Sequence, residues 1–411
     1  MLMTINNKAG WALLTLLLVS PAQGFYIQDY QDTTIELRGF ARGLVIANDY
    51  PNDPLLFTEE HAINGGVFGR LMLDARQSAF SIEVHAVQSI LDKDLRASSN
   101  KSIAASSVER SDALDWRYAN QRADFFIDRL NMQYAGDRLT VKVGRQPINL
   151  AASFYFTPND FFAPFAAQTF FRTYKPGVDA ARLDWQFNDD SQLSLITVLD
   201  YNPDFTQATG WQNTPDWGDT TFLARASTLV DTFQMAGIIA TLDDDDIIGF
   251  DFQGELFSYF GFRGEGHLRF PDETYLKRDA KLALAVDHRW ASSFTLRLEH
   301  FYQRSGARDE KDYQLSDILL NRGQLYLARN YTALGAGYEF NPLLTGDAVW
   351  LYNHQDTSSL LALYSTYSLS NESELAIGLN IPVGKQPENG QLQTEFGSFP
   401  LSLTAEYRLY F

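Results

Sequence analysis

Apolar and polar residues alternate along most of this chain, and the polar positions carry many charges. In the segment 67–76, Leu71 and Leu73 fall on one face of an expected strand, while Arg70 and Asp74 fall on the other. A period of two residues is that of a β-strand. Charged side chains would be costly in the dry core of a soluble sheet, but the wet interior of a transmembrane barrel accepts them. The pattern therefore predicts an all-β fold, a transmembrane antiparallel β-barrel.

The same alternation recurs over the whole chain. It is clearest in the segments 33–47, 80–87, 139–143, 183–187, 282–286, 294–298, 375–381 and 401–411. Counting strands by this alternation gives about 18, with 16 as the competing count, and a barrel of that size encloses an aqueous channel. Short turns alternate with long connections, as in outer-membrane barrels. Residues 25–411 are expected to form one barrel from a single chain.

The amino terminus has the features of a secretory signal peptide. A basic residue, Lys8, precedes the apolar stretch Trp11–Val19, and small residues surround a cleavage point after Gly24. The apolar stretch is about half the ~20 residues that a membrane-spanning helix needs. Residues 1–24 are therefore predicted to be a signal peptide.

The carboxyl terminus favours a membrane barrel over a soluble β-protein. Residues 401–411 alternate strictly and end on an aromatic residue, Phe411, and their number matches the ~9–11 residues of a tilted membrane-crossing strand. This ending resembles the terminal strand that the outer-membrane assembly machinery recognises. We expect outer-membrane lipid and that machinery as partners, and the outer membrane of a Gram-negative bacterium as the location.

Composition excludes several other classes of protein. The 411 residues include no Cys, so disulfides and thiolate metal sites are absent, and a formal net charge of −18 argues against nucleic acid as a partner.

Aromatic residues gather beside the expected short turns, where they would form an interfacial girdle. These aromatics are Tyr134, Trp185, Phe187, Tyr259, Phe260, Trp290, Phe340 and Phe411.

The connection 147–174 is unusually rich in Phe and Pro for a loop in water. We expect it to fold into the barrel and narrow the channel, and the alternative is a rigid external flap. The residues that would line or brace the constriction are Phe154, Tyr155, Phe156, Phe161, Phe162, Phe165, Phe170 and Phe171.

The surroundings of this connection also suggest a family. Val143-Gly-Arg-Gln146 ends a strand, Asn-Asp-Phe-Phe-Ala-Pro follows at 159–164, and Tyr-Lys-Pro-Gly-Val-Asp follows at 174–179. This arrangement resembles the bacterial porin-like barrels related to the alginate-export outer-membrane family. The resemblance implies a barrel of 18 strands and an export or uptake pore. The exporter of that family has a strongly basic constriction. The charges expected on the inner wall of this barrel are mixed, which weighs against an anionic polysaccharide as the transported solute.

Arginine side chains are the candidate pore lining. Arg38, Arg42, Arg70, Arg76 and Arg145 lie on the polar faces of the strands expected nearest the Phe-rich connection. One interpretation is an arc of positive charge that selects anions. The other is that each arginine pairs with an acidic residue of a neighbouring strand.

An enzyme is not expected. The six histidines lack the spacing of a zinc motif, and the nearest approach to a His/Ser site is His354 with Ser358. No cofactor or metal is predicted. The sequence instead indicates an outer-membrane pore for passive passage of hydrophilic solutes, with oligo- or polysaccharide export as one form of that activity. The alternative is a non-conducting barrel that acts as a scaffold, adhesin or receptor.

Overall fold

The structure is a computed structural model. It describes residues 26–30, 32–57, 59–92, 116–119, 123–203, 210–211, 213–242, 244–272, 278–314 and 325–411. The expected signal peptide, residues 1–24, lies outside the described residues. No helix in the described ranges is long and apolar enough to cross a membrane.

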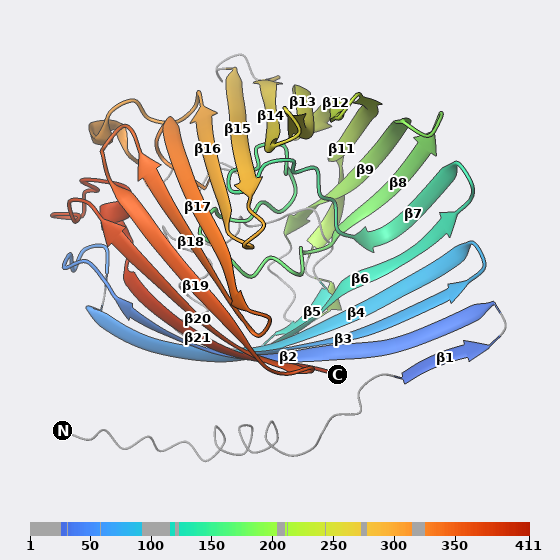
Figure 1. Cartoon of the computed structure of the whole chain (residues 1–411), viewed down its shortest axis with the longest axis horizontal. Helices are drawn as coiled ribbons and strands as arrows, with labels where there is room; N and C mark the ends of the chain where they lie inside the picture. The colour runs from blue at the N-terminus through green and yellow to red at the C-terminus, as the bar shows by residue number, and fades with distance from the viewer. Residues whose placement is uncertain are drawn as a thin grey trace.

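Eighteen antiparallel strands form a closed ring (Figure 1). Each pairs with the next along the chain, and the last pairs with the first from Phe40↔Tyr410 to Asp49↔Leu401, which closes the barrel. The 18-strand count is thus confirmed and the count of 16 is wrong. The strands are β2 (Thr33–Asp49), β3 (His61–Gln77), β4 (Phe80–Leu91), β6 (Ala123–Ala135), β7 (Leu139–Gln146), β8 (Val178–Gln186), β9 (Ser191–Pro203), β11 (Asn213–Val230), β12 (Phe233–Leu242), β13 (Asp245–Leu256), β14 (Phe260–Phe270), β15 (Asp279–Arg289), β16 (Thr295–Gln303), β17 (Asn330–Asn341), β18 (Leu344–Asn353), β19 (Ser359–Ser370), β20 (Ser373–Val383) and β21 (Leu401–Tyr410).

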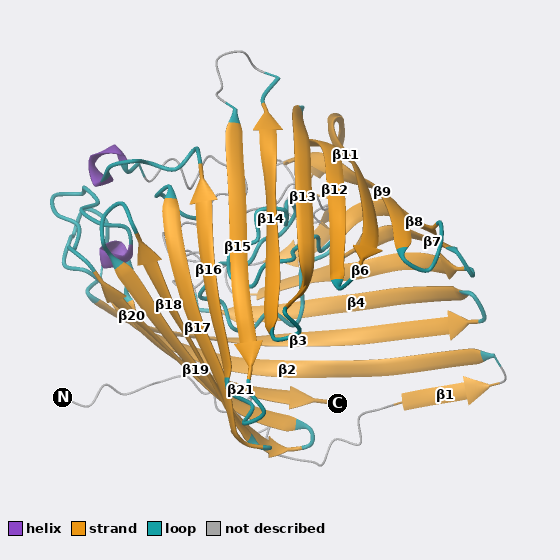
Figure 2. Ribbon diagram, turned by 45° about the horizontal axis from the view of Figure 1, so that its top comes forward, coloured by secondary structure: helices purple, strands orange, loops and turns teal. Residues whose placement is uncertain are grey.

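Three short strands are attached to this ring. β1 (Tyr26–Tyr30) pairs with the start of β2, beyond the part that β21 covers, and β5 (Trp116–Ala119) pairs with β6 and with β10 (Gly210–Trp211). Two 3-10 turns, η1 (Glu310–Asp312) and η2 (Phe396–Ser398), lie among the loops at one end (Figure 2).

The two ends of the barrel differ. At one end, which we call the short-turn end, the hairpins have only a few connecting residues. For example, two residues connect Gln77 at the end of β3 to Phe80 at the start of β4. At the other, the long-loop end, the connections include 50–60, 147–177, 304–329 and 384–400. This alternation is the one predicted from the sequence, and it places the interior of the barrel within reach of the long loops.

The outward face is apolar, as the alternation predicts. Leu71 and Leu73 are exposed on the outside, while Arg70 and Met72 of the same strand are buried inside. The aromatics beside the short turns are largely exposed, including Trp185, Phe260 and Phe340. The backbone of the terminal residue, Phe411, is hydrogen-bonded to the backbone of Gly39. The Phe411 ring covers Gly39 so closely that a side chain at position 39 would collide with it. An apolar band with aromatic ends is the outer surface that a bilayer requires.

Candidate pore and its inner loop

Residues 147–177, called the inner loop below, fold inside the barrel rather than over it. Gly144 turns the chain at the end of β7 with a φ of +110°, and a side chain there would collide with the carbonyl of Leu130. The amide of Gln146 donates to the carbonyls of Lys142, Gly144 and Ala180, which fixes the base of the loop. Figure 1 shows the loop as green segments within the ring. The inward position predicted from the sequence is confirmed, and the external flap is wrong.

Two buried carboxylates of the wall hold the backbone of this loop. Glu299 on β16 accepts hydrogen bonds from the N–H groups of Phe154 and Phe156 at 2.8 and 2.6 Å, and from Tyr155 at 3.2 Å. Glu265 on β14 accepts from three more. Its donors are the N–H groups of Ala152, Ser153 and Asn159. Carboxylate oxygens that receive backbone N–H groups form strong, charge-assisted bonds, so the loop is pinned at two places on one wall.

Basic residues within the loop stabilise its fold. The Arg172 guanidinium donates to the carbonyls of Phe154, Ala166, Ala167 and Thr169, which joins distant parts of the loop. Farther on, Lys175 forms an ion pair with Asp160. Burial raises the pKa of the Asp160 carboxyl, and the Lys175 ammonium opposes that rise. The loop is therefore a folded unit with its own internal bonds.

Aromatic side chains attach the loop to opposite parts of the wall. The ring of Phe154 lies between the guanidinium groups of Arg263 and Arg297, at 3.9 and 5.1 Å from the ring centroid. The ring of Phe171 lies between Arg42 and Arg408, at 4.6 and 4.4 Å. The first pair belongs to β14 and β16, and the second to β2 and β21, across the barrel. Cation–π contacts at both sites hold the loop across the lumen.

The remaining aromatic contacts fill one side of the lumen. Phe156 stacks on Phe301 with ring centroids 4.9 Å apart, within an apolar cluster on β15 to β19 that also includes Tyr331 and Phe396. A second cluster joins Phe162 and the start of the loop to β8, β9, β11 and β12. Side chains of the two clusters therefore cover the inner faces of these strands.

Charged pairs lie on the inward faces of β2, β3, β4, β6, β7, β8 and β21, and several of them are buried. Arg38 pairs with Asp74 at 2.5 Å, Arg70 with Asp128 at 2.7 Å, and Lys142 with Glu83 at 2.8 Å. Further pairs there are Arg42–Glu406, Arg408–Glu406, Arg182–Asp184 and Arg145–Asp179. Arg38, Arg42 and Arg145 pair with an acidic residue of the adjacent strand, as in the second interpretation of the arginines. Arg70 differs, because its partner Asp128 lies on β6, with β4 between the two strands.

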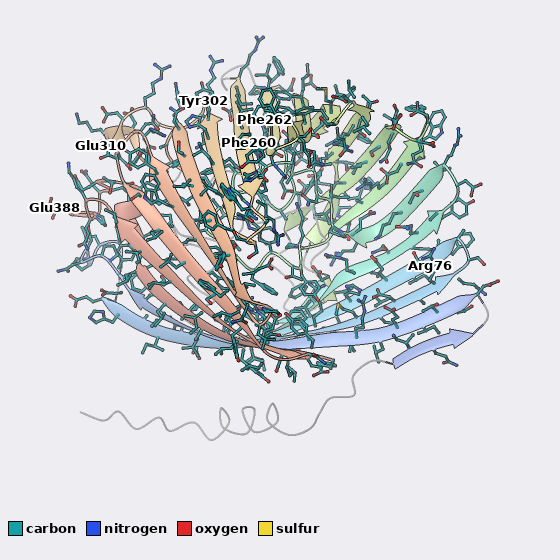
Figure 3. The ribbon with its side chains drawn as sticks, in the orientation of Figure 1. Arg76, Phe260, Phe262, Tyr302, Glu310 and Glu388 are labelled. Carbon is teal, nitrogen blue, oxygen red and sulfur yellow. The ribbon has the colours of Figure 1, made fainter. Side chains whose placement is uncertain are left out.

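The five predicted lining arginines occupy different environments. Arg38, Arg42 and Arg70 face inward on β2 and β3, and Arg42 and Arg70 also contact rings of the inner loop. Arg145 is largely buried at the base of the loop, where it donates to Asp179 and to the Ile127 carbonyl. Arg76 is exposed at the short-turn end, opposite the end that carries Glu310 and Glu388 (Figure 3). The structure thus brings three of the five together.

Of the predicted constriction residues, most brace the loop. Tyr155, Phe156 and Phe162 are buried in the two apolar clusters, and Phe154, Phe161 and Phe165 are half-buried. Sequence reasoning did not assign the anchoring role of Glu265 and Glu299. The available signal was a single acidic residue on the inward face of each of these two strands.

Comparison with known proteins gives the fold. No family model matches the chain, and no curated protein matches it. Among solved structures, Acinetobacter baumannii OccAB4 is 10% identical with a TM-score of 0.57, over 92% of this chain and 98% of that one. Pseudomonas aeruginosa OccK8 (OprE) is 8% identical with a TM-score of 0.57, over 94% and 99%. The fold is shared.

A. baumannii OccAB2 is also similar in structure, with 9% identity and a TM-score of 0.58 over 92% of this chain and 98% of that one. Identities this low carry over the architecture alone. The finer resemblance to alginate-export barrels remains a prediction, because no comparison tests it.

The geometry gives no support to a His/Ser site. His354 is exposed on the outer surface, whereas Ser358 is buried and its hydroxyl accepts from the N–H of Phe396. Among the described residues, no group of three His, Asp or Glu side chains is placed to hold a metal.

Proposed function

We propose that the chain is an outer-membrane porin that lets small hydrophilic solutes pass down their gradients. The observation that carries this proposal is the inner loop, pinned across the lumen and facing a wall of paired charges. The fold neighbours OccAB4 and OccK8 are outer-membrane porins, which supports the same function. In this proposal the inner loop and the wall of β2, β3 and β21 together bound the narrowest part of the path.

The paired charges bear on selectivity. A guanidinium that already donates to a carboxylate presents a dipole rather than a free charge to a passing solute. The proposal therefore includes weak ion selectivity and a preference for neutral or zwitterionic solutes over polyanions. Export of an anionic polysaccharide would need a surplus of basic groups, which the pairing of Arg38, Arg42 and Arg70 does not provide.

The test is single-channel conductance in a planar bilayer. Gln146 and Val178 are neighbours on adjacent strands, so residues 150–174 can be replaced by a short Gly-Ser linker without straining the barrel. We expect a higher conductance than in the native chain. The control is Ile239→Ala on the outer surface, which should leave conductance unchanged. An unchanged conductance in the linker variant would refute the constriction.

The second candidate is the non-conducting barrel. The apolar clusters over β15 to β19 favour it, because they fill part of the lumen with side chains. If the native protein is folded by circular dichroism and heat-modifiability but never opens, and the linker variant does open, the inner loop is a plug and the chain is a scaffold or receptor.

A further inference from the structure

Two histidines converge on the outer surface near the long-loop end. His300 on β16 and His354, just after β18, flank Thr332 on β17. The Nδ1 atom of His300 lies 3.1 Å from the Thr332 hydroxyl oxygen, and the Nε2 atom of His354 lies 2.8 Å from it. Both rings are exposed. Two imidazole nitrogens thus point to one position, where the Thr332 hydroxyl lies.

The three residues lie on the outward face of the barrel. Leu296, Leu298 and Leu334 are exposed on the outer surface. His300 lies on the same face of β16 as the first two leucines, and Thr332 lies on the same face of β17 as Leu334. This site is therefore separate from the inner loop and the charged wall, and the proposed pore does not use it.

The spacing of the rings suits a shared metal ion. A metal–nitrogen bond of about 2.0–2.1 Å places each ring centroid about 3.2 Å from the metal, so two rings at a tetrahedral angle lie about 5.2 Å apart. The observed centroids are 5.6 Å apart. The Thr332 hydroxyl now occupies the meeting point, and a rotation of that side chain about χ1 vacates it.

The surroundings favour a cation over a phosphate. Phosphate groups are usually bound by arginine or lysine. Arg329, three residues before Thr332, donates its guanidinium N–H groups to the carbonyls of Arg304 and Gly306 instead. Arg297, three residues before His300, lies over the ring of Phe154 inside the barrel. Imidazole is a preferred ligand of Zn²⁺, Cu²⁺ and Ni²⁺. We propose that His300 and His354 form a two-histidine site for a divalent transition metal on the outer surface, with water completing the coordination.

The experiment uses the full-length mature barrel without a histidine tag, folded in detergent. Zn²⁺ binding is measured by titration calorimetry, and Cu²⁺ coordination by electron paramagnetic resonance, in which two imidazole nitrogens produce a resolved splitting. We expect one high-affinity metal per chain. His300→Gln and His354→Gln should each weaken binding at least tenfold and remove one nitrogen from the Cu²⁺ spectrum.

A matched control separates this site from other histidines. His61 is exposed at the same end and pairs with Asp49 at 2.8 Å, so it is the competing surface site. His61→Gln should leave the affinity and the two-nitrogen spectrum unchanged. The proposal is overturned if the native barrel binds no metal, if His61→Gln abolishes binding, or if the two site variants, shown to be folded by heat-modifiability, bind as the native chain does.

Discussion

Glu265 and Glu299 offer the sharpest test of how the inner loop is held. Each accepts three backbone N–H groups of the loop. Replacing both by Gln keeps their size but turns one oxygen of each into an N–H₂ group, which faces donors. A hydrogen bond to a charged group contributes about 1.5–3 kcal/mol and a neutral one about 0.5–1.5 kcal/mol, while an unpaired buried N–H costs about 1–3 kcal/mol.

The net change follows from these terms. A neutral amide carries no charge whose burial costs free energy, and this offsets part of the loss. Each substitution should then destabilise the seated loop, relative to the released loop, by about 2 kcal/mol. Since 1.4 kcal/mol is a factor of ten, each substitution should shift the balance between seated and released loop by about 30-fold. The seated loop narrows the path, so release raises conductance.

The assay is single-channel recording of the double variant. We expect larger mean conductance and added open-channel noise from loop movement. Asp251→Asn is the control, because Asp251 pairs with Arg225 on the wall and none of its described bonds reaches the loop. If the folded double variant shows the conductance and noise of the native barrel, these carboxylates do not hold the loop and the reasoning is wrong.

Three further predictions concern charge, packing and pH. Asp128→Asn removes the carboxylate that Arg70 and Arg129 share, so the reversal potential in a salt gradient should move toward anion preference, from a native value near zero. Gly335→Ala places a methyl group against the Tyr155 ring and should raise conductance by displacing it, whereas Gly43→Ala meets open space and should change nothing. Burial raises the pKa of Glu395, in the 384–400 loop, from its ordinary 4.5 to about 8, so the folded barrel keeps this proton longer than the unfolded chain. The free energy of unfolding should therefore be highest below about pH 4.5, fall by up to about 1.4 kcal/mol per pH unit toward pH 8 and then level off; melting curves of Glu395→Gln should lack this slope, and an equal slope in the variant would assign it to other groups.

The strands and the inward loop could be predicted because they depend on local pattern. Leu71 and Arg70 must face opposite sides of any strand, whatever the strand pairs with. Likewise, the Phe and Pro content of residues 147–174 predicts burial before any partner is known. These features require only the residue and its near neighbours.

The partners of the charged residues could not be predicted, because they depend on register and closure. Arg42 pairs with Glu406, which is 364 residues away and becomes a neighbour only when the last strand meets the first. The partners of Glu265 are backbone N–H groups of a loop, which have no sequence signature at all. Whether a wall arginine is free or paired is therefore decided by the fold.

The closure between β2 and β21 has a consequence for biogenesis. During synthesis the inner loop precedes its anchors on β14 and β16 by more than a hundred residues. The barrel closes later still, when the last strand, β21, pairs with β2. The loop can therefore reach its anchors only after β16 has been synthesised, and the seam between the two terminal strands is the last part of the wall around it to become available.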